Sequence, residues 1–376
     1  MGTGIFRRFT KGFFVLCNVA LALLFLLGCY ASLFDPQHFW FIGLLTLASL
    51  YLLLALVLFI FFWLFAKTKF MLISIIAIAC AWKPIQQIIK LAGAPDFKIA
   101  KKTADIRVMS WNVEHFDINQ HKAHPEVKAQ MLALISRYDP DIACFQEMVG
   151  GDFDSTAINY VPYIAERLHY KNYFYSYDKK NDFDSKHHFG IITFSKYPII
   201  EKHTIQYEPH NYNSIFQYID ILKDGVTLRV FNIHLQSLKF SEASREYIED
   251  PTMENKIDLG KSRTVISKLK TGFLKRKVQS ERIKKALKES PYPVILCGDF
   301  NDVPNSYAYN TIGRDLKNAF AEKGTGIGRT FSGISSTLRI DNIFIDRRFD
   351  ITQFIRVEKE LSDHYPVITD LQYGSK

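Results

Sequence analysis

The stretch Pro293-Val294-Ile295-Leu296-Cys297-Gly298-Asp299-Phe300-Asn301 decides how the C-terminal part of this chain folds. The apolar run from Val294 to Cys297 is short and uninterrupted, which predicts a buried strand. A carboxylate and an amide, Asp299 and Asn301, follow directly. Side chains at the end of a strand can build a site while the body of the strand builds the core.

The same arrangement recurs along the chain. Polar residues sit at the ends of other apolar strands in Ser110-Trp111-Asn112, Gln146-Glu147, Asn232-Ile233-His234-Leu235, Arg339-Ile340-Asp341 and Ser362-Asp363-His364. Taken singly, each has an ordinary structural explanation as a turn, a cap or a strand edge. Together they predict one site assembled from many strand ends.

Between these segments the periodicity alternates between strand and helix. Strands are predicted at 107–113, 141–146, 190–194, 216–222, 227–235, 294–297, 340–345 and 367–371, and helices at 126–138, 155–168 and 262–288. Helices that alternate with strands and hairpins are typical of an α/β sandwich, with stacked mixed sheets and helices outside.

The N-terminal part has a different composition. Residues 12–34 contain no Asp, Glu, Lys or Arg, and neither do residues 36–66. Both runs exceed the roughly 20 residues that a membrane-spanning helix needs. We expect spans at about 12–34 and 39–65. A shorter apolar block, 70–82, is either a third span or a helix on the membrane surface.

Charge supports a division into three parts: an anchor at 1–91 with two to three transmembrane helices, a linker at 92–105, and a domain at 106–376. Residues 1–105 hold ten Lys/Arg against three Asp, a net +7, whereas the remaining 271 residues carry only +2. Basic residues flank the apolar runs and set topology. Three spans place the C-terminal domain on the extracytoplasmic side and two place it in the cytoplasm. We favour three, and so expect an integral membrane protein with an extracytoplasmic domain.

The polar residue types restrict the chemistry. Asn, Glu and Asp oxygens are the hard ligands that Mg²⁺ prefers, and histidines supply acid–base groups. The sequence has no Cys/His zinc set, no Gly-rich phosphate loop and no Gly-x-Ser-x-Gly nucleophile elbow. This combination favours metal-assisted attack of water on a phosphoester.

The quoted motifs, with Ser-Trp-Asn-Val at 110–113 and Gly-Asp-Phe-Asn at 298–301, occur in the order of the endonuclease/exonuclease/phosphatase superfamily, which the domain at 106–376 resembles. The resemblance implies a four-layer α/β sandwich of the DNase I type behind the N-terminal transmembrane helices. It implies an Mg²⁺- or Mn²⁺-dependent hydrolase acting on ester bonds.

The same resemblance implies roles for eight residues. Asn112, Glu147 and Asp363 correspond to the ligands and near neighbours of the metal. Asp299 and Asn301 correspond to the pair that positions the attacking water and a phosphate oxygen. His364, oriented by Asp341, corresponds to the acid–base dyad, and His234 to the group that contacts a non-bridging oxygen or helps to protonate the leaving group. Some nucleases pair the equivalent of His234 with a glutamate, and Lys186-His187-His188-Phe189-Gly190 offers no acid there.

We therefore expect a membrane-anchored phosphoesterase that acts on a phosphodiester or phosphomonoester: a lipid headgroup, a small phosphoester or a nucleic acid. Membrane lipids are its expected partners, and no protein partner is implied. A nuclease is the first alternative, because twelve Lys/Arg lie in 256–288. The same stretch also fits a solvated helix face or contact with anionic headgroups. A catalytically inactive, membrane-tethered binding module is the second alternative, weakened because every expected position holds a competent residue.

Overall fold

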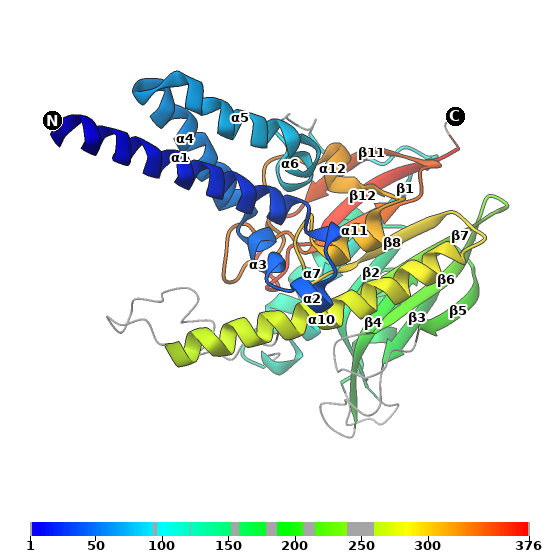
Figure 1. Ribbon diagram of the computed structural model, residues 1–376. Helices are drawn as coiled ribbons and strands as arrows, with labels where there is room; N and C mark the ends of the chain where they lie inside the picture. Colours follow the sequence, from blue (N-terminus) through cyan, green and yellow to red (C-terminus); the bar gives the residue numbers. More distant parts are fainter. Residues whose placement is uncertain are drawn as a thin grey trace.

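The computed structural model describes residues 2–91, 93, 96–120, 122–151, 158–177, 186–205, 215–238 and 259–374. It contains two six-stranded mixed sheets with helices on their outer faces and a bundle of apolar helices to one side (Figure 1). The strands that the sequence predicts are all present. The predicted helix at 155–168 begins at Tyr160, and its first three residues lie outside the described residues, as do the first three of the basic stretch at 256–288.

The first sheet has the order β11-β12-β1-β2-β4-β3. Its strands are β1 (Ile106–Asn112), β2 (Ile142–Gly151), β3 (Asn172–Tyr177), β4 (His187–Ser195), β11 (Phe349–Arg356) and β12 (Val367–Tyr373). β1 and β2 are parallel, and α7 (Pro125–Tyr138) connects them. A parallel pair requires such a crossover, because a tight turn can join only antiparallel strands.

The second sheet has the order β5-β6-β7-β8-β10-β9. Its strands are β5 (Ile199–Ile205), β6 (Phe216–Lys223), β7 (Val226–His234), β8 (Val294–Asp299), β9 (Lys317–Asn318) and β10 (Asp341–Ile345). It repeats the motif of the first sheet, since β7 and β8 are parallel and the long helix α10 (Leu259–Lys288) lies between them in the chain. Each sheet thus has one parallel pair whose carboxyl ends point in the same direction.

Alternation along the strands assigns their side chains to three cores. Ile106 and Val108 of β1 join the cluster between the sheets, whereas Met109 and Trp111 face α7 and α8 (Tyr160–Arg167). On the far side, apolar residues of β7 and β8 pack against Ile283 of α10 and against α11 (Tyr307–Gly313). The order is helices, sheet, sheet, helices, which confirms the predicted α/β sandwich.

The N-terminal helices form a fourth, separate cluster. α1 (Gly2–Cys29), α4 (Ser49–Ala66) and α5 (Met71–Cys80) pack around Phe25, Leu56 and Ala77. Asn18 of α1 accepts a hydrogen bond from Ser74 of α5 at 2.8 Å, a polar link of the kind that joins helices in an apolar environment. Two helical stretches, Arg7–Cys29 and Ser49–Ala66, are long and apolar enough to cross a membrane.

A third span is possible only as a bent pair. Thr68–Cys80 and Trp82–Ile88 meet at an angle of 68°. Pro84 lies in the first turn of α6 (Trp82–Ile88), where its missing N–H costs nothing, but it cannot continue the hydrogen-bond ladder of α5. The break at Ala81 follows from that restriction.

The span expected at 39–65 is shorter in the structure, because its first part folds into α2 (Pro36–Phe39) and α3 (Ile42–Leu47). These turns pack on the domain. The Phe273 ring of α10 occupies the space beside Gly43, where a Cβ atom would come within 2.8 Å of the ring, and the Lys270 ammonium lies 5.4 Å from the Trp40 ring centre. The residues before α4 are thus in contact with α10.

The anchor also meets the domain through backbone carbonyls. Arg339, nearly fully buried, donates to the carbonyls of Gln87 and Ile88 at the end of α6, and Asn305 Nδ2 donates to the Pro84 carbonyl at 3.0 Å. Part of the predicted linker is docked as well, because the Lys98 N–H donates to Gln353 at 2.9 Å. The anchor is thus fastened to the domain at defined points.

Candidate active site

The two parallel strand pairs bring the predicted residues to one edge of the sandwich. Asn112 ends β1, His234 ends β7 and Asp299 ends β8, while Asp341 begins β10 directly opposite Asp299. Carboxyl ends of parallel strands form the usual place for a site in α/β folds. Residues separated by more than 200 positions in the chain thereby become neighbours.

Glu147 reaches the same place through an irregularity. The register between β2 and β4 shifts between Phe145 and Met148, and Glu147 has a φ of 53°. A bulge redirects the side chain of the extra residue, and a non-glycine residue in the left-handed region is uncommon and often functional. Glu147 Oε1 lies 3.7 Å from His234 Nε2, and its Oε2 lies 3.5 Å from His115 Nε2.

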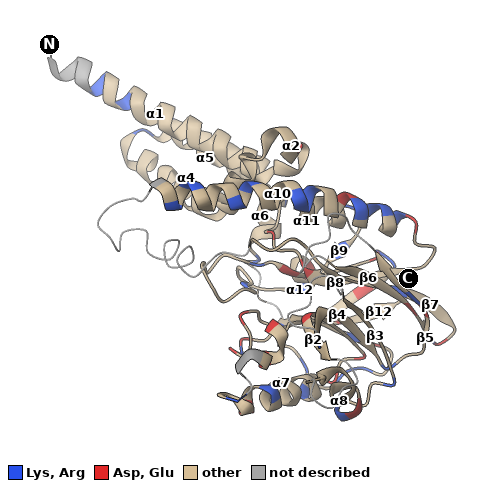
Figure 2. Cartoon of the chain, turned by 90° about the horizontal axis from the view of Figure 1, so that it is seen from below, with Lys and Arg blue, Asp and Glu red and all other residues tan. Residues whose placement is uncertain are grey.

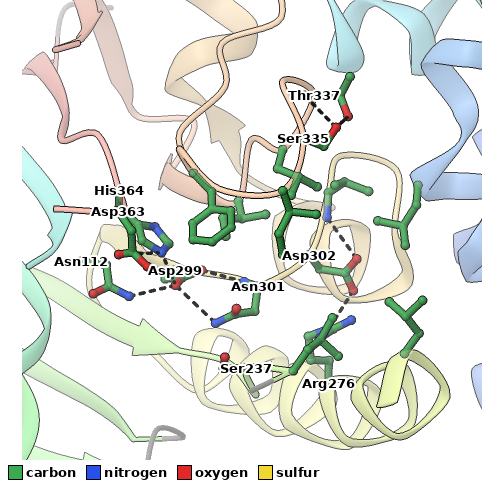
Figure 3. A pocket seen from close by; sticks show the side chains of 18 of the residues that line it. Asn112, Ser237, Arg276, Asp299, Asn301, Asp302, Ser335, Thr337, Asp363 and His364 are labelled. Atoms are coloured by element: carbon green, nitrogen blue, oxygen red, sulfur yellow. Dashed lines mark hydrogen bonds and ion pairs between the residues drawn. The ribbon is translucent and has the colours of Figure 1, made fainter. Parts of the chain in front are cut away.

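Asp299 is the centre of the site (Figure 3). Its Oδ2 accepts hydrogen bonds from Asn112 Nδ2 and Asn301 Nδ2, each at 3.2 Å, and its Oδ1 accepts the Asn301 N–H at 2.7 Å. His234 Nε2 and His364 Nε2 lie 3.5 and 3.7 Å from Oδ2. Burial by itself raises the pKa of the Asp299 carboxyl, but the two histidines and the Asn301 N–H outweigh it and hold that pKa at about 2.

His364 and Asp341 form a buried pair, with 2.8 Å between Nδ1 and Oδ2. Two hydrogen bonds hold the backbone of His364 in the loop before β12. The Trp111 indole N–H donates to the His364 carbonyl at 2.9 Å, and the His364 N–H donates to Ser362 Oγ at 3.1 Å. Burial works to lower the pKa of His364, but the charges of Asp341 and Asp299 dominate, and the pKa lies well above its usual range. The imidazole is therefore poised as a proton donor.

His234 has a similar but weaker electrostatic setting. Burial lowers the pKa of its imidazole, whereas the neighbouring carboxylates of Asp299 and Glu147 raise it. The carboxylates dominate, so the pKa of His234 lies above its ordinary value. Among the described carboxylates, Glu147 and Asp299 are the ones within 4 Å of its Nε2. The carboxylates closest to His234 therefore belong to strands β2 and β8, and not to the segment around Lys186.

Two groups of residues at this site could hold a cation. Asp299, Asp341 and His364 place one ligand atom each within 4.8 Å of one another. The residues predicted as ligands, Asn112, Glu147 and Asp363, line the pocket beside that cluster. Of the four predicted carboxylates, Glu147 and Asp363 remain 17% and 29% exposed, against 1% and 0% for Asp299 and Asp341, so solvent reaches the first two.

The donor chemistry fits a hard divalent ion. Carboxylate and amide oxygens dominate, and Asp341 Oδ1 is buried without a hydrogen-bond partner among the described residues. Crowding of negative charge is visible at Glu114, where burial and the charge of Asp363 raise the carboxyl pKa to about 7. A crowded group of carboxylates of this kind is stabilised by a bound cation.

Sequence reasoning missed Glu114 and His115, which line the pocket. Glu114 Oε2 accepts the Asp363 N–H at 3.0 Å. Glu114 and His115 have left-handed φ values of 42° and 61°. The available signal was their position, because they directly follow the strand that ends in Asn112. Polar residues directly after the end of a strand can thus line the site in the same way as those within the motif.

Two other residues of the sequence motifs have a structural role and not a chemical one. Gln146 and Asn232 are fully buried, and Gln146 Nε2 donates to Asn232 Oδ1 at 2.7 Å, which joins the two sheets through their side chains. Asn232 Nδ2 in turn donates to the Ile192 carbonyl at 2.8 Å. A buried amide pair that bridges two sheets fixes their relative position, and so that of Glu147 and His234, which follow in the chain.

The basic stretch is divided between structure and surface. Arg276 is buried and donates to Asp302 at 3.1 Å and to the Gln236 carbonyl at 3.0 Å, so its charge is neutralised inside the protein. Lys and Arg recur along the length of α10 (Figure 2). Several of them form surface ion pairs, such as Lys284 with Asp315 at 2.6 Å.

Comparison with known proteins follows the same division of the chain. Residues 109–364 match the model of the Endonuclease/Exonuclease/phosphatase family, and residues 11–88 match a model described as Domain of unknown function (DUF8431). This chain therefore belongs to the Endonuclease/Exonuclease/phosphatase family, which confirms the resemblance seen in its motifs. No curated protein matches the sequence.

Solved structures agree with the fold. The endonuclease/exonuclease/phosphatase from Beutenbergia cavernae is 17% identical, with a TM-score of 0.50 over 72% of each chain. TDP2 of D. rerio in complex with a single-strand DNA product is 17% identical, with a TM-score of 0.49 over 72% of this chain and 99% of that one. A mannosyl-6-phosphatase of Bacteroides thetaiotaomicron is 17% identical, with a TM-score of 0.47 over 71% and 100%. The first likeness shows the DNase I-like sandwich and nothing about substrate.

Proposed function

We propose that this protein is a membrane-anchored, divalent-metal-dependent phosphoesterase that hydrolyses a phosphodiester or phosphomonoester. The observation that carries the proposal is the cluster around Asp299, where carboxylates, two amides and two imidazoles from both sheets converge beside one pocket. Such a set of groups suits the activation of water and the stabilisation of a phosphoryl group.

The roles follow from contacts and charge. Asp299 stays ionised and, with Asn301, orients an attacking water by hydrogen bonds. His364, held by Asp341 at Nδ1, presents a protonated Nε2 towards the pocket and donates to a phosphate oxygen or the leaving group. His234 provides a second donor on the opposite side of Asp299. An Mg²⁺ or Mn²⁺ ion held by Asn112, Glu147 and Asp363 would supply Lewis-acid stabilisation of phosphoryl charge.

We further propose the division of the chain into an anchor at 1–91, a linker at 92–105 and a catalytic domain at 106–376. We infer three spans in this anchor, with the domain outside the cytoplasm. Arg7 and Arg8 at one end of α1 and Lys67 and Lys69 between α4 and α5 lie at the end of the bundle away from the sheets. Basic residues gathered at one end indicate the cytoplasmic side, which leaves the domain on the other.

The test uses the full-length protein in detergent micelles. Hydrolysis of bis-(4-nitrophenyl) phosphate and of plasmid DNA is measured after EDTA treatment and again after addition of Mg²⁺ or Mn²⁺. We expect EDTA to abolish release of nitrophenol and the added ion to restore it. Asp299→Asn should lower the rate by at least about 100-fold, while Asp315→Asn, a surface carboxylate far from the pocket, serves as the matched control.

Either of two results would contradict the proposal: full activity of Asp299→Asn, or nitrophenol release that is indifferent to EDTA. Circular dichroism and thermal melting of each variant separate a lost fold from a lost reaction. Cleavage of DNA in preference to the small diester would favour the nuclease alternative.

A further inference from the structure

The catalytic cluster forms only one wall of its pocket. The cavity has a volume of about 440 Å³, within the range of small-molecule sites, and its other wall is mainly apolar. Three parts of the chain build that wall: Leu47 and Tyr51 from the anchor, Val265 and Leu269 from α10, and Ile334 and Leu338 from the loop before β10. We call these six residues the apolar wall.

The contribution of the anchor is direct. Leu47 ends α3 and Tyr51 lies in the first turn of α4, so the wall begins where the apolar helix leaves the domain. The Tyr51 hydroxyl lies 3.3 Å from Ser335 Oγ, and Ser335 Oγ in turn lies 3.0 Å from Thr337 Oγ1. The pocket is therefore complete only when anchor and domain are together, and Tyr51, which lines it, belongs to a helix that is a candidate membrane span.

The helix α10 contributes a selective face. Val265 and Leu269 are four positions apart, so they lie above one another on the side that lines the cavity. Ile266, their neighbour in the chain, is 42% exposed on a different face. The residues that α10 offers to the cavity are two aliphatic side chains and Arg276, whose charge is paired with Asp302. No unpaired phosphate-binding cation comes from this helix within the described part of the pocket.

The loop links the wall to the catalytic residues. Ser332 donates to the Asp363 carbonyl through both its N–H (2.7 Å) and its hydroxyl (2.9 Å), and the Phe331 ring lies 5.0 Å from the His364 ring. Ile334 has a φ of 64°, a costly conformation for a β-branched residue. Backbone strain of this kind persists at ligand clamps, where it holds a side chain in place.

We propose that the apolar wall receives the hydrocarbon chain of an amphiphilic phosphoester whose headgroup lies at Asp299 and His364. The inference rests on the proposed function and narrows its substrate class. A chain lying along Leu47 and Leu269 extends from the reacting phosphoryl group toward the start of α4, so the substrate passes from the bilayer into the pocket without fully entering water. An apolar wall continuous with a membrane helix suits a lipid tail and offers little to a nucleic acid backbone.

The first experiment measures chain-length dependence. Full-length protein in lipid nanodiscs is given three phosphodiesters: ethyl, octyl and dodecyl 4-nitrophenyl phosphate. We expect kcat/KM to rise by about 10- to 100-fold from ethyl to dodecyl, because each buried methylene adds to binding. Partition into the nanodisc also favours long chains. The comparison of the variants with the wild type therefore decides whether the apolar wall binds the chain. Leu269→Gln should remove most of the preference, and the isomeric control Ile266→Gln should retain it.

Turnover of the ethyl ester reports the chemistry separately. If wild type and Leu269→Gln hydrolyse the ethyl ester equally and show the same chain-length preference, the apolar wall does not bind the chain and the inference is wrong. If no ester is hydrolysed, the proposed function has failed, and a binding measurement is needed to decide the inference.

That measurement is photolabelling with a dodecyl phosphate that carries a diazirine at the end of its chain. We expect labels at 42–51, 259–275 and 331–340 in both the wild type and Asp299→Asn, and at least five-fold less labelling in Leu269→Gln. Labels spread evenly over the outer faces of α1 and α4 would overturn the inference, whatever the outcome of the hydrolysis assay.

Discussion

His364 Nδ1 lies 2.8 Å from Asp341 Oδ2, with both side chains almost completely buried. Asp341 begins a strand of the second sheet, whereas His364 precedes a strand of the first sheet. The contact therefore spans the two sheets at the edge where the pocket opens. It fixes which imidazole nitrogen faces Asp341 and leaves Nε2 on the side of Asp299, 3.7 Å from its carboxylate.

Loss of the Asp341 charge should lower turnover and leave substrate affinity nearly unchanged. In Asp341→Asn, the amide can still contact His364 but no longer stabilises the imidazolium or selects its tautomer. We expect kcat to fall by about 10²- to 10⁴-fold with KM within a factor of three. Steady-state kinetics with bis-(4-nitrophenyl) phosphate checks this. A variant with more than a third of wild-type kcat would show that the pair is only structural.

Glu147→Gln should raise the concentration of Mg²⁺ needed for half-maximal activity by at least about 10-fold. The bulge in β2 aims this carboxylate into the pocket, and a neutral amide binds a divalent ion less strongly. Calorimetric titration of Mn²⁺ gives a second readout that does not depend on turnover. Glu166→Gln, an exposed residue of α8, is the matched control and should bind the ion as the wild type does.

The buried pair of Arg107 and Asp370 should make a large contribution to stability. Arg107 Nε and Nη2 donate to the two Asp370 oxygens at 2.7 and 2.8 Å, and neither side chain is more than 2% exposed. Arg107→Met leaves a buried charge without its partner, so we expect a loss of about 3–5 kcal/mol in the free energy of unfolding.

Thermal and denaturant unfolding of the full chain in detergent measure that loss. In the double variant Arg107→Met with Asp370→Leu, much of the stability should return, because no buried charge then remains. If the single variant melts with the wild type, the pair carries none of the stability assigned to it.

Arg339→Met should loosen the anchor from the domain. Arg339 donates to the carbonyls of Gln87, Ile88 and Ile327, and its guanidinium lies 3.7 Å from the centre of the Phe320 ring. Without these donors the last carbonyls of α6 lose their partners in the protein interior. We expect faster limited proteolysis between anchor and domain, by at least five-fold.

The matched control for this prediction is Arg314→Met, an exposed arginine just after α11. It should be cut at the wild-type rate. Equal rates for all three proteins would mean that Asn305 and the remaining contacts hold the anchor by themselves. The photolabelling of the apolar wall should weaken in Arg339→Met as well, because Leu47 and Tyr51 move with the anchor.

The limits of prediction differ from one element to another. Apolar runs made β2 and β8 predictable, because a strand buried on both faces reads as a nearly continuous hydrophobic sequence. β5 has an exposed, polar middle at Glu201 to His203, so its pattern does not distinguish it from a loop. The separation of α3 from α4 was missed for the opposite reason: its residues are as apolar as a membrane span, so the sequence does not distinguish the two helices.

The amino-acid sequence by itself determined the family, the sandwich fold and the presence of apolar helices, since these depend on local patterns and on motifs in a given order. The tertiary structure alone decided what surrounds the chemistry. Glu114 and His115 enter the pocket through backbone angles, Glu147 through a bulge, and Leu47 and Tyr51 through docking of the anchor. These placements depend on contacts between residues far apart in the chain, and hydrophobic periodicity carries no record of which distant surfaces will meet.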